Sequence, residues 1–179
     1  MVPTATADSA SRVPPGRVSV PQPYGAAPQQ RQYLSEEGIG WIAAHGGAGA
    51  TTLTQLLGGT DLGCRWPDAE LGEPATVMVV ARTNAEGMRA MSRALNALRE
   101  GRHPAGMRLT GLVLLADAPQ RLPLALSRRI RVLKSVAPVH RVPWIPEWRL
   151  GRQPPKLPPA LLKLAKAAGV QLDERGRRS

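Results

Sequence analysis

A chain of 179 residues is long enough for one ordinary domain with tails, or at most for two very small domains. It carries 24 basic and 13 acidic residues, and the resulting formal charge of +11 favours partners with negative charge. The absence of phenylalanine argues against an aromatic platform for nucleobases, and a single cysteine excludes a disulfide framework or a Cys-x-x-Cys motif. No apolar run reaches the ~18–20 residues of a membrane-spanning helix, so we expect a soluble, cytoplasmic protein with no integral membrane segment.

The first 37 residues differ in composition from the rest of the chain. They hold six prolines and many small polar residues, and they show no periodic apolar pattern. Such a segment cannot bury enough apolar surface to offset the entropy lost on ordering. We therefore predict that residues 1–37 form a disordered, proline-rich arm.

From residue 38 to about residue 146 the pattern is that of an α/β domain. Apolar runs of strand length occur at residues 39–44, 76–81, 109–116 and 139–144. Runs that are apolar on both faces are typical of parallel strands covered by helices on each side. We predict a three-layer, mostly parallel sheet flanked by helices, as in P-loop NTPases.

Two segments between these strands have helical spacing. Apolar residues recur every three or four positions over residues 85–99, just after a candidate capping box of Thr83 with Glu86 or, alternatively, an Asn84 cap. A second helix is predicted over residues 122–136.

The last part of the chain, residues 147–179, is predicted to be a proline-rich basic extension with a short helix over residues 160–168. Trp144 and Trp148 lie where this extension begins. We predict that they clamp the extension onto the domain, and an exposed tryptophan pair would instead mark a protein-binding anchor.

The most informative stretch is residues 41–53, which read W-I-A-A-H-G-G-A-G-A-T-T-L. A strand runs into a glycine-rich turn, and two threonines open a helix. Glycines let backbone N–H groups converge on a phosphate, and the start of the helix adds partial positive charge. Thr51 stands where a P-loop places its magnesium-binding hydroxyl group.

The candidate phosphate-binding residues are Gly46, Gly47, Ala48, Gly49, Ala50, Thr51 and Thr52. A tight turn that needs its glycines only for backbone geometry is the alternative.

This stretch resembles the deviant Walker A loop of the ParA/MinD-like branch of the P-loop NTPases, which reads K-G-G-x-G-K-S/T-T. The match consists of Gly46, Gly47, Gly49, Thr51 and Thr52. His45 and Ala50 stand where that family has its two lysines. The resemblance extends more loosely to residues 76–99 and 109–117, and the chain is also similar to shortened ParA-like proteins of actinobacteria.

The resemblance implies ATP or ADP with Mg²⁺ as cofactor. It also implies a homodimer, or pairing with a ParA-like ATPase or with a secretion or conjugation component. The loss of a charge-assisted hydrogen bond weakens binding by roughly 1.5–3 kcal/mol, and the missing lysines would also stabilise the transferred phosphoryl group. We therefore expect a non-catalytic or weakly nucleotide-binding adaptor with a degenerate Walker A loop. The alternative is a divergent ATPase completed by one of the chain's four lysines, Lys134, Lys156, Lys163 and Lys166.

Two acidic residues are candidates for a role beside a nucleotide. Asp117 follows the apolar run over residues 109–116, and the resemblance implies that it contacts the base or supports the metal; the start of a plain turn is the alternative. Asp68 lies between residues 57 and 76, a segment so short that the strands and switch regions of the family are expected to be largely missing. Asp68 is therefore either a carboxylate that survives from a switch region or a solvated loop residue.

Basic residues dominate the last third of the chain, with six basic and no acidic residues between positions 121 and 141. Arg128, Arg129, Arg131 and Lys134 surround the predicted second helix. Such a surface attracts DNA, RNA, anionic lipid or an acidic protein, and ParA-like proteins commonly bind DNA nonspecifically through surface arginines. A basic DNA-binding module with a vestigial loop is therefore a third hypothesis, and a plain solvated surface is the alternative for these four residues.

Overall fold

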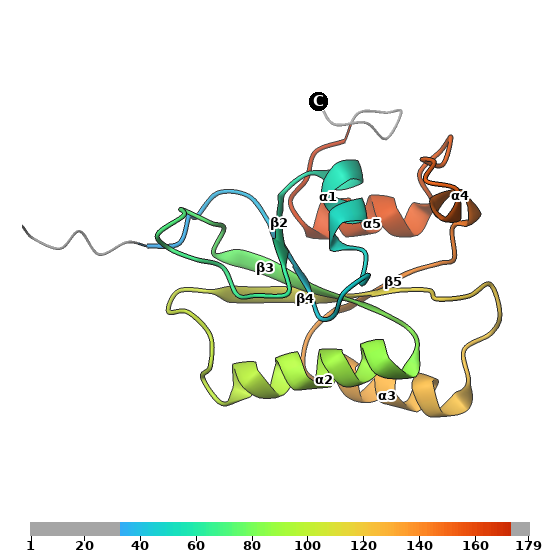
Figure 1. Ribbon diagram of the computed structural model, residues 1–179, viewed down its shortest axis with the longest axis horizontal. Coiled ribbons are helices and arrows are strands. Elements are labelled where there is room, and N and C mark those ends of the chain that lie inside the picture. The colour runs from blue at the N-terminus through green and yellow to red at the C-terminus, as the bar shows by residue number, and fades with distance from the viewer. Residues whose placement is uncertain (1–32, 173–179) are drawn as a thin grey trace, which may run out of the picture. The chain divides into compact units, whose positions relative to one another are not determined.

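The computed structural model describes residues 33–172. Of the predicted disordered arm, residues 1–32 lie outside this part of the chain. The described end of that arm is ordered against the domain, since Leu34 is buried in the core and the Ser35 N–H donates to the Glu73 carbonyl at 2.8 Å. The elements follow in the order β1 Gly40–Ala43, α1 Ala50–Leu57, β2 Thr60–Gly63, β3 Thr76–Arg82, α2 Ala85–Arg99, β4 Arg108–Leu115, α3 Leu124–Lys134, β5 Val139–Val142, α4 Pro146–Arg149 and α5 Pro159–Ala167 (Figure 1).

The strands form one five-stranded sheet in the order β2-β1-β3-β4-β5, and every neighbouring pair is parallel. The prediction of an α/β fold with a parallel sheet flanked by helices is confirmed. The chain runs outward to β2 on one side of β1 and to β3, β4 and β5 on the other. In doubly wound sheets of this order, ligands bind at the carboxyl ends of the strands where the direction reverses, here between β1 and β3.

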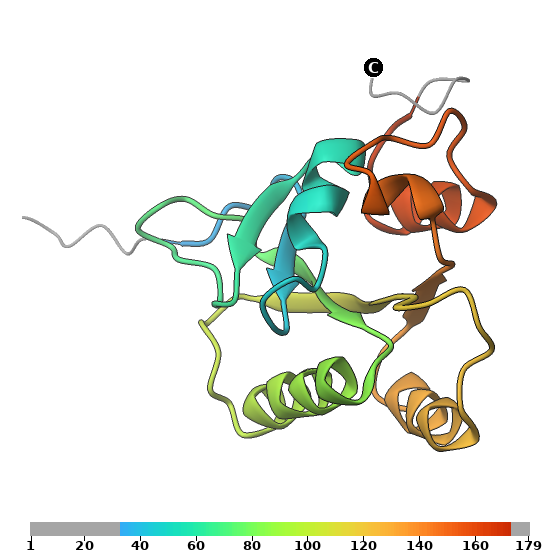
Figure 2. The same ribbon diagram turned by 45° about the vertical axis from the view of Figure 1, so that its right-hand side comes forward.

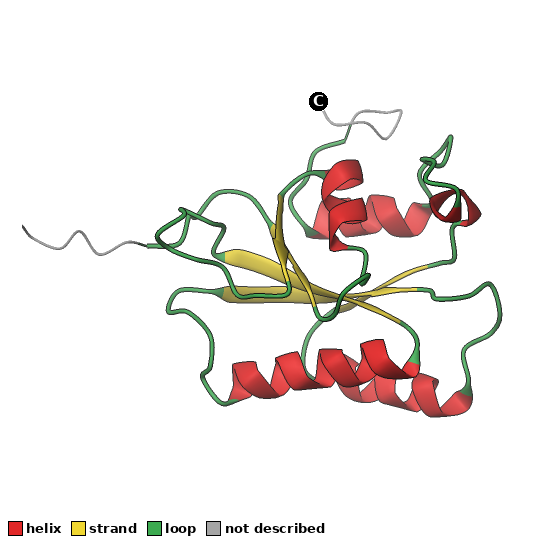
Figure 3. Ribbon diagram, in the orientation of Figure 1, coloured by secondary structure: helices red, strands yellow, loops and turns green. Residues whose placement is uncertain are grey.

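Helices cover the sheet in two layers, with α1 and α5 on one face and α2 and α3 on the other (Figures 1, 2 and 3). Alternate residues of β3 pack against the two helical layers, because successive side chains of a strand point to opposite faces. Met78 and Val80 pack with α1 and α5, whereas Val77 and Val79 pack with α2 and α3. This two-sided burial is the reason that the strand reads as a continuous apolar run.

The N-terminus of α2 shows how the sheet edge is organised. Asn84 is the cap, because its side-chain oxygen accepts a hydrogen bond from the Gly87 N–H at 2.8 Å. Thr83 is 6% exposed, and its hydroxyl accepts a hydrogen bond from the Asp117 N–H at 3.2 Å. The capping-box alternative for Thr83 is therefore wrong, and Thr83 instead joins the ends of β3 and β4.

The segment between α1 and β3 contains a strand that the sequence analysis expected to be missing. This strand, β2, pairs in parallel with β1, and only Leu62 of its four residues is buried. The following loop is closed by the ion pair of Arg65 with Glu73. Asp68 belongs to this loop, where its carboxylate accepts a hydrogen bond from the Glu70 N–H at 2.8 Å. Asp68 thus has a local role in turn geometry.

The C-terminal part contributes to the core beside α1. Leu161, Leu164 and Ala165 of α5 are buried in the same apolar cluster as Leu53 of α1, and Trp148 packs against this cluster. The predicted short helix over residues 160–168 is observed at Pro159–Ala167. Within residues 33–172, the helices are all too short or too polar to span a lipid bilayer.

Candidate functional site

The glycine-rich loop lies at the carboxyl edge of the sheet. It leaves β1 after Ala43 and enters α1 at Ala50, and it faces the end of the neighbouring parallel strand, β3. The loop therefore stands at the reversal point between β1 and β3, where folds of this order bind their ligands.

The backbone of the loop alternates between two conformations. Gly47 and Gly49 have left-handed φ angles of +74° and +102°, whereas Gly46, Ala48 and Ala50 do not have positive φ. Alternation of this kind turns successive N–H groups toward one side and forms the concave arrangement called a nest, which binds anions. Residues with a Cβ atom rarely adopt such angles, and this explains the glycines at positions 47 and 49.

Most N–H groups of the loop have no acceptor within the described part of the protein. The Ala48 N–H donates to the His45 carbonyl at 3.2 Å, and the first helical bond runs from Leu53 to the Gly49 carbonyl at 3.1 Å. No side chain caps the helix. The donors without an acceptor in residues 33–172 are the N–H groups of Gly46, Gly47, Gly49, Ala50, Thr51 and Thr52. Groups of this kind are satisfied by water or by a ligand.

Packing against the sheet and α5 fixes the shape of the loop. Ala48 and Ala50 are 1% and 3% exposed and belong to the apolar cluster between the sheet, α1 and α5. At Gly49 a Cβ atom would lie 2.3 Å from Leu115 Cδ1. The core therefore holds the nest in its shape, and the side chain of residue 50 points into that core.

Thr51 lies beside a carboxylate that the sequence analysis missed. The Thr51 hydroxyl donates a hydrogen bond to Asp61 Oδ2 at 2.5 Å, and Asp61 Oδ1 accepts from the Gly63 N–H at 2.9 Å. Asp61 belongs to β2, a strand that the sequence pattern does not predict, and Asp68 was the acidic residue singled out in this segment. The usable signal is the short spacing, because consecutive strands of a βαβ unit are usually neighbours in the sheet, and β2 does pair with β1 here.

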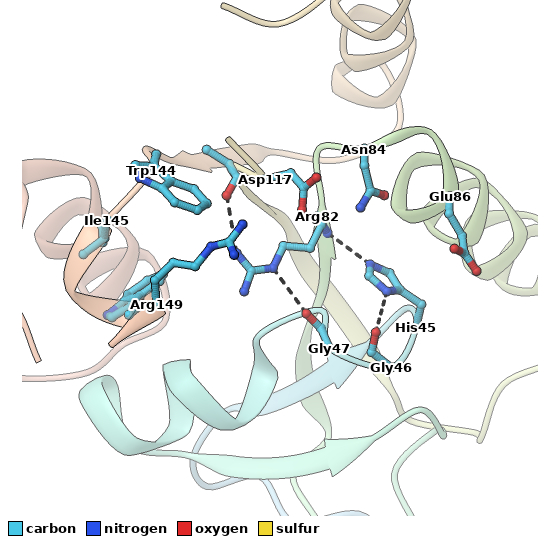
Figure 4. Close-up of a pocket in the computed structure, with 12 residues that line it drawn as sticks. His45, Gly46, Gly47, Arg82, Asn84, Glu86, Asp117, Trp144, Ile145 and Arg149 are labelled. Carbon is cyan, nitrogen blue, oxygen red and sulfur yellow. Dashed lines mark hydrogen bonds between the residues drawn. The ribbon is translucent and has the colours of Figure 1, made fainter. Parts of the chain in front are cut away.

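A pocket of about 410 Å³ adjoins the loop at the same sheet edge (Figure 4). The loop contributes His45, Gly46 and Gly47 to its wall. The ends of β3 and β4 and the segment after β5 supply the other lining residues, which are Arg82, Asn84, Glu86, Ala116, Asp117, Trp144, Ile145, Trp148 and Arg149.

Arg82 ties the loop to the sheet. Its Nε donates to the Gly47 carbonyl at 3.2 Å and its Nη1 to the Ala116 carbonyl at 3.4 Å. Its backbone N–H donates to His45 Nε2 at 3.2 Å, so the proton of the neutral imidazole is on Nδ1, which donates to the Gly46 carbonyl at 2.8 Å. His45 and Arg82 together hold the first half of the loop against β3.

The remaining charged groups of the pocket come from three elements. Arg149 of α4 lies over the Trp144 ring, with its guanidinium carbon 5.3 Å from the ring centroid. Asp117 follows β4 and Glu86 lies in the first turn of α2. Among the described residues, neither carboxylate forms an ion pair with Arg82 or Arg149.

The predicted basic residues lie elsewhere. Arg128, Arg129, Arg131 and Lys134 are all exposed on α3, and none of them lines the pocket. The other three lysines, which come from the segment before α5 and from α5 itself, do not line it either. The cations that line the pocket beside the loop are thus two arginines, Arg82 and Arg149, whereas the sequence analysis expected a lysine to complete the loop.

Comparison of the chain with family models, with curated proteins and with solved structures finds no match in any of the three. Its function is therefore inferred from the geometry of the loop and the adjoining pocket.

Proposed function

We propose that this chain is an adaptor of the ParA/MinD type that binds ATP or ADP with Mg²⁺ on residues 46–52 and does not hydrolyse it. The observation that carries this proposal is the nest of N–H groups without acceptors at the carboxyl edge of the sheet. Backbone N–H groups at the start of a helix bind phosphate through hydrogen bonds and through the helix dipole, and they need no lysine to do so.

The oxygen atoms of Thr51 and Asp61 fit a magnesium ion bound together with phosphate. Mg²⁺ keeps several waters and takes one or two carboxylates plus phosphate oxygens as ligands. Among the described residues there is no cluster of three metal-binding side chains, so the protein's share would be limited to this hydroxyl and this carboxylate. The ion would neutralise phosphate charge and orient the ligand on the loop.

Two features support the absence of hydrolysis. The position of the second family lysine is occupied by Ala50, which is 3% exposed and packs in the core, so this position faces away from a bound phosphate. The position of the first is occupied by His45, whose ring nitrogens are both engaged, by Gly46 and by Arg82. Without lysines the charge that develops on a transferred phosphoryl group lacks its usual stabilisation.

Titration calorimetry of the full chain with ATP and ADP, with and without Mg²⁺, tests the proposal. We expect saturable binding below about 1 mM and no release of phosphate. Thr51→Ala and Asp61→Asn should remove the magnesium dependence of binding. Thr54→Ala is the matched control, because its hydroxyl bonds the Ala50 carbonyl one turn further along the same helix.

Two outcomes would overturn the proposal. Absence of binding of either nucleotide at about 1 mM would show that the nest holds no nucleotide. Phosphate release that Thr51→Ala abolishes would establish the divergent ATPase instead.

As an adaptor, the chain would pair with a ParA-like ATPase, a secretion or conjugation component, or a second copy of itself, and co-purification with and without nucleotide distinguishes these partners.

A second candidate function, nonspecific DNA binding, is favoured by the outer surface of α2 and α3. The four basic residues of α3 are exposed and have no acidic partner within residues 33–172, and α2 lies beside α3 and adds the exposed Arg89, Arg93 and Arg99. We expect retardation of duplex DNA at about 50 mM salt that is largely lost at about 200 mM, because binding releases counterions from the phosphates. Replacement of Arg128, Arg129 and Arg131 together by Gln should weaken it, and no retardation at low salt would remove this function.

A further inference from the structure

We propose that the pocket beside the loop is a second phosphate subsite, in which Arg82 and Arg149 hold the phosphate that follows the one on the loop. The ligand would then be a nucleoside di- or triphosphate, and a monophosphate would bind much more weakly. This inference rests on the proposed function, since it assumes that the loop holds the first phosphate.

Arg82 is anchored in a way that leaves donors for a ligand. A guanidinium group has five N–H donors. Two nitrogens of Arg82 donate to main-chain carbonyls, Nε to Gly47 and Nη1 to Ala116, and these bonds fix the plane of the group. The second N–H of Nη1 and both N–H groups of Nη2 have no acceptor among residues 33–172. A fixed guanidinium with adjacent unused donors is suited to bidentate binding of a phosphate.

Arg149 enters the same pocket from the opposite side. It comes from α4, after β5, whereas Arg82 ends β3, and both side chains point into the pocket (Figure 4). Its guanidinium lies over the ring of Trp144, and this contact restricts the side chain while its N–H groups have no acceptor among residues 33–172. The pocket therefore presents two oriented guanidinium groups.

The two subsites are continuous. Gly46 and Gly47 belong to the nest and also line the pocket, so a phosphate on the nest is adjacent to the space between the arginines. Arg82 itself bonds the Gly47 carbonyl and thus lies directly at the junction. Adjacent phosphates of one ligand can therefore occupy the nest and the pocket together.

Two carboxylates, Glu86 and Asp117, balance the formal charge of the two arginines in the pocket wall. Because of this balance, a free polyphosphate with several negative charges would be attracted only weakly. Its magnesium complex carries less charge, and Thr51 and Asp61, at the end of the loop where α1 begins, would hold the ion. The arrangement thus favours a polyphosphate bound together with Mg²⁺.

The test is calorimetric titration of the full chain with ATP, ADP and AMP in the presence of Mg²⁺. We expect ATP and ADP to bind at least about 10-fold more tightly than AMP. Arg82→Gln and Arg149→Gln should each weaken the binding of ATP and ADP by about 10- to 100-fold and that of AMP by less than about 3-fold, which corresponds to the loss of a charge-assisted hydrogen bond. Arg82→Lys, which keeps the charge but not the planar fork, should be intermediate.

Arg152→Gln is the matched control, because Arg152 is an exposed arginine near Arg149 that does not line the pocket. Arg149 is itself exposed, so Arg149→Gln keeps the test valid even if Arg82→Gln disturbs the fold. Urea unfolding of each variant separates lost binding from lost stability.

Three results would overturn the inference while the proposed function stands. The first is equal affinity of the wild type for AMP, ADP and ATP. The second is unchanged affinity for ATP and ADP in both arginine variants. The third is an equal loss of affinity for AMP and for ATP in these variants, which would mean that the arginines only shape the loop. Failure of the wild type to bind any of the three nucleotides would instead overturn the proposed function, and the inference with it.

Discussion

Alanine substitutions along the loop test whether its backbone has the geometry described. At Gly49 two penalties combine, because φ is +102° and the new Cβ atom would lie 2.3 Å from Leu115 Cδ1. The left-handed conformation costs about 1–2 kcal/mol for a residue with a Cβ atom, and overpacking a core costs about 1–3 kcal/mol. The smaller entropy of the unfolded chain returns about 0.4–1 kcal/mol. We expect Gly49→Ala to lower the free energy of unfolding by about 2–4 kcal/mol.

The two neighbouring glycines provide graded controls. A Cβ atom at Gly47 would meet nothing within 4 Å, so only its φ of +74° opposes alanine, and we expect a loss of about 1 kcal/mol. Gly46 has neither a left-handed φ nor a close neighbour, so Gly46→Ala should be neutral or slightly stabilising.

Urea unfolding followed by circular dichroism measures the series. With a slope of about 2 kcal/mol per molar urea, the midpoint should fall by about 1–2 M for Gly49→Ala and by about 0.5 M for Gly47→Ala. Equal midpoints for the variants at positions 46 and 49 would refute both the left-handed conformation of Gly49 and its contact with Leu115. The nest would then have no structural basis.

Three further predictions concern stability and use the same measurement. Burial lowers the pKa of the half-buried His140 below its ordinary value of 6.5, so the unfolded chain binds more protons than the folded one in this range. The free energy of unfolding should therefore fall as the pH drops from about 7 toward the folded pKa, and His140→Gln should remove this part of the slope; an unchanged slope would contradict the assignment. Asn84→Ala should cost about 1 kcal/mol through the lost cap of α2, and a cost near zero would mean that water replaces the cap. Trp41→Phe should cost about 1–3 kcal/mol, because the buried indole N–H bonds the Gly58 carbonyl at 2.6 Å, and a neutral effect would show that this carbonyl finds another donor.

The sequence predicted those elements whose burial leaves a pattern. Strands β1, β3 and β4 carry apolar residues on both faces, so each was recognised as an apolar run, with ends within one residue of those observed. Strand β5 is less apolar, because His140 and Arg141 lie between its two valines, and its run was predicted two residues too long at the carboxyl end. Strand β2 reads T-D-L-G, so Leu62 is its single apolar side chain and the strand gives no apolar run at all. Its existence depends on parallel pairing with β1, which is a tertiary effect that no local pattern encodes.

The pairing of strands, which no local pattern encodes, also decides which site residues can be predicted from the sequence. The glycines and threonines of the loop follow one another in sequence, so their joint role was visible there. Asp61 reaches Thr51 only because β2 pairs with β1. Arg82 reaches the loop only because β3 lies on the other side of β1. A charged residue directly after an apolar strand run is nevertheless a usable signal, since the carboxyl ends of parallel strands meet at one edge. Applied evenly, this rule would have selected Arg82 together with Asp117.

The backbone of the loop also bears on the alternative of a plain turn. A connection that serves stability alone would place a polar cap at the start of the helix, as Asn84 does for α2 at the same sheet edge. The loop instead keeps a left-handed glycine as N-cap of α1, a second left-handed glycine two residues before it, and N–H groups that have no acceptor within residues 33–172. A glycine N-cap stabilises a helix by about a few tenths of a kcal/mol less than Asn or Ser does, and each glycine loses more conformational entropy on folding than other residues do. N–H groups without an acceptor at the start of a helix are satisfied by water or by an anionic ligand. Here Leu115 packs against Gly49 and Arg82 donates to the Gly47 carbonyl, so these two contacts fix the loop while its N–H groups keep no acceptor among residues 33–172.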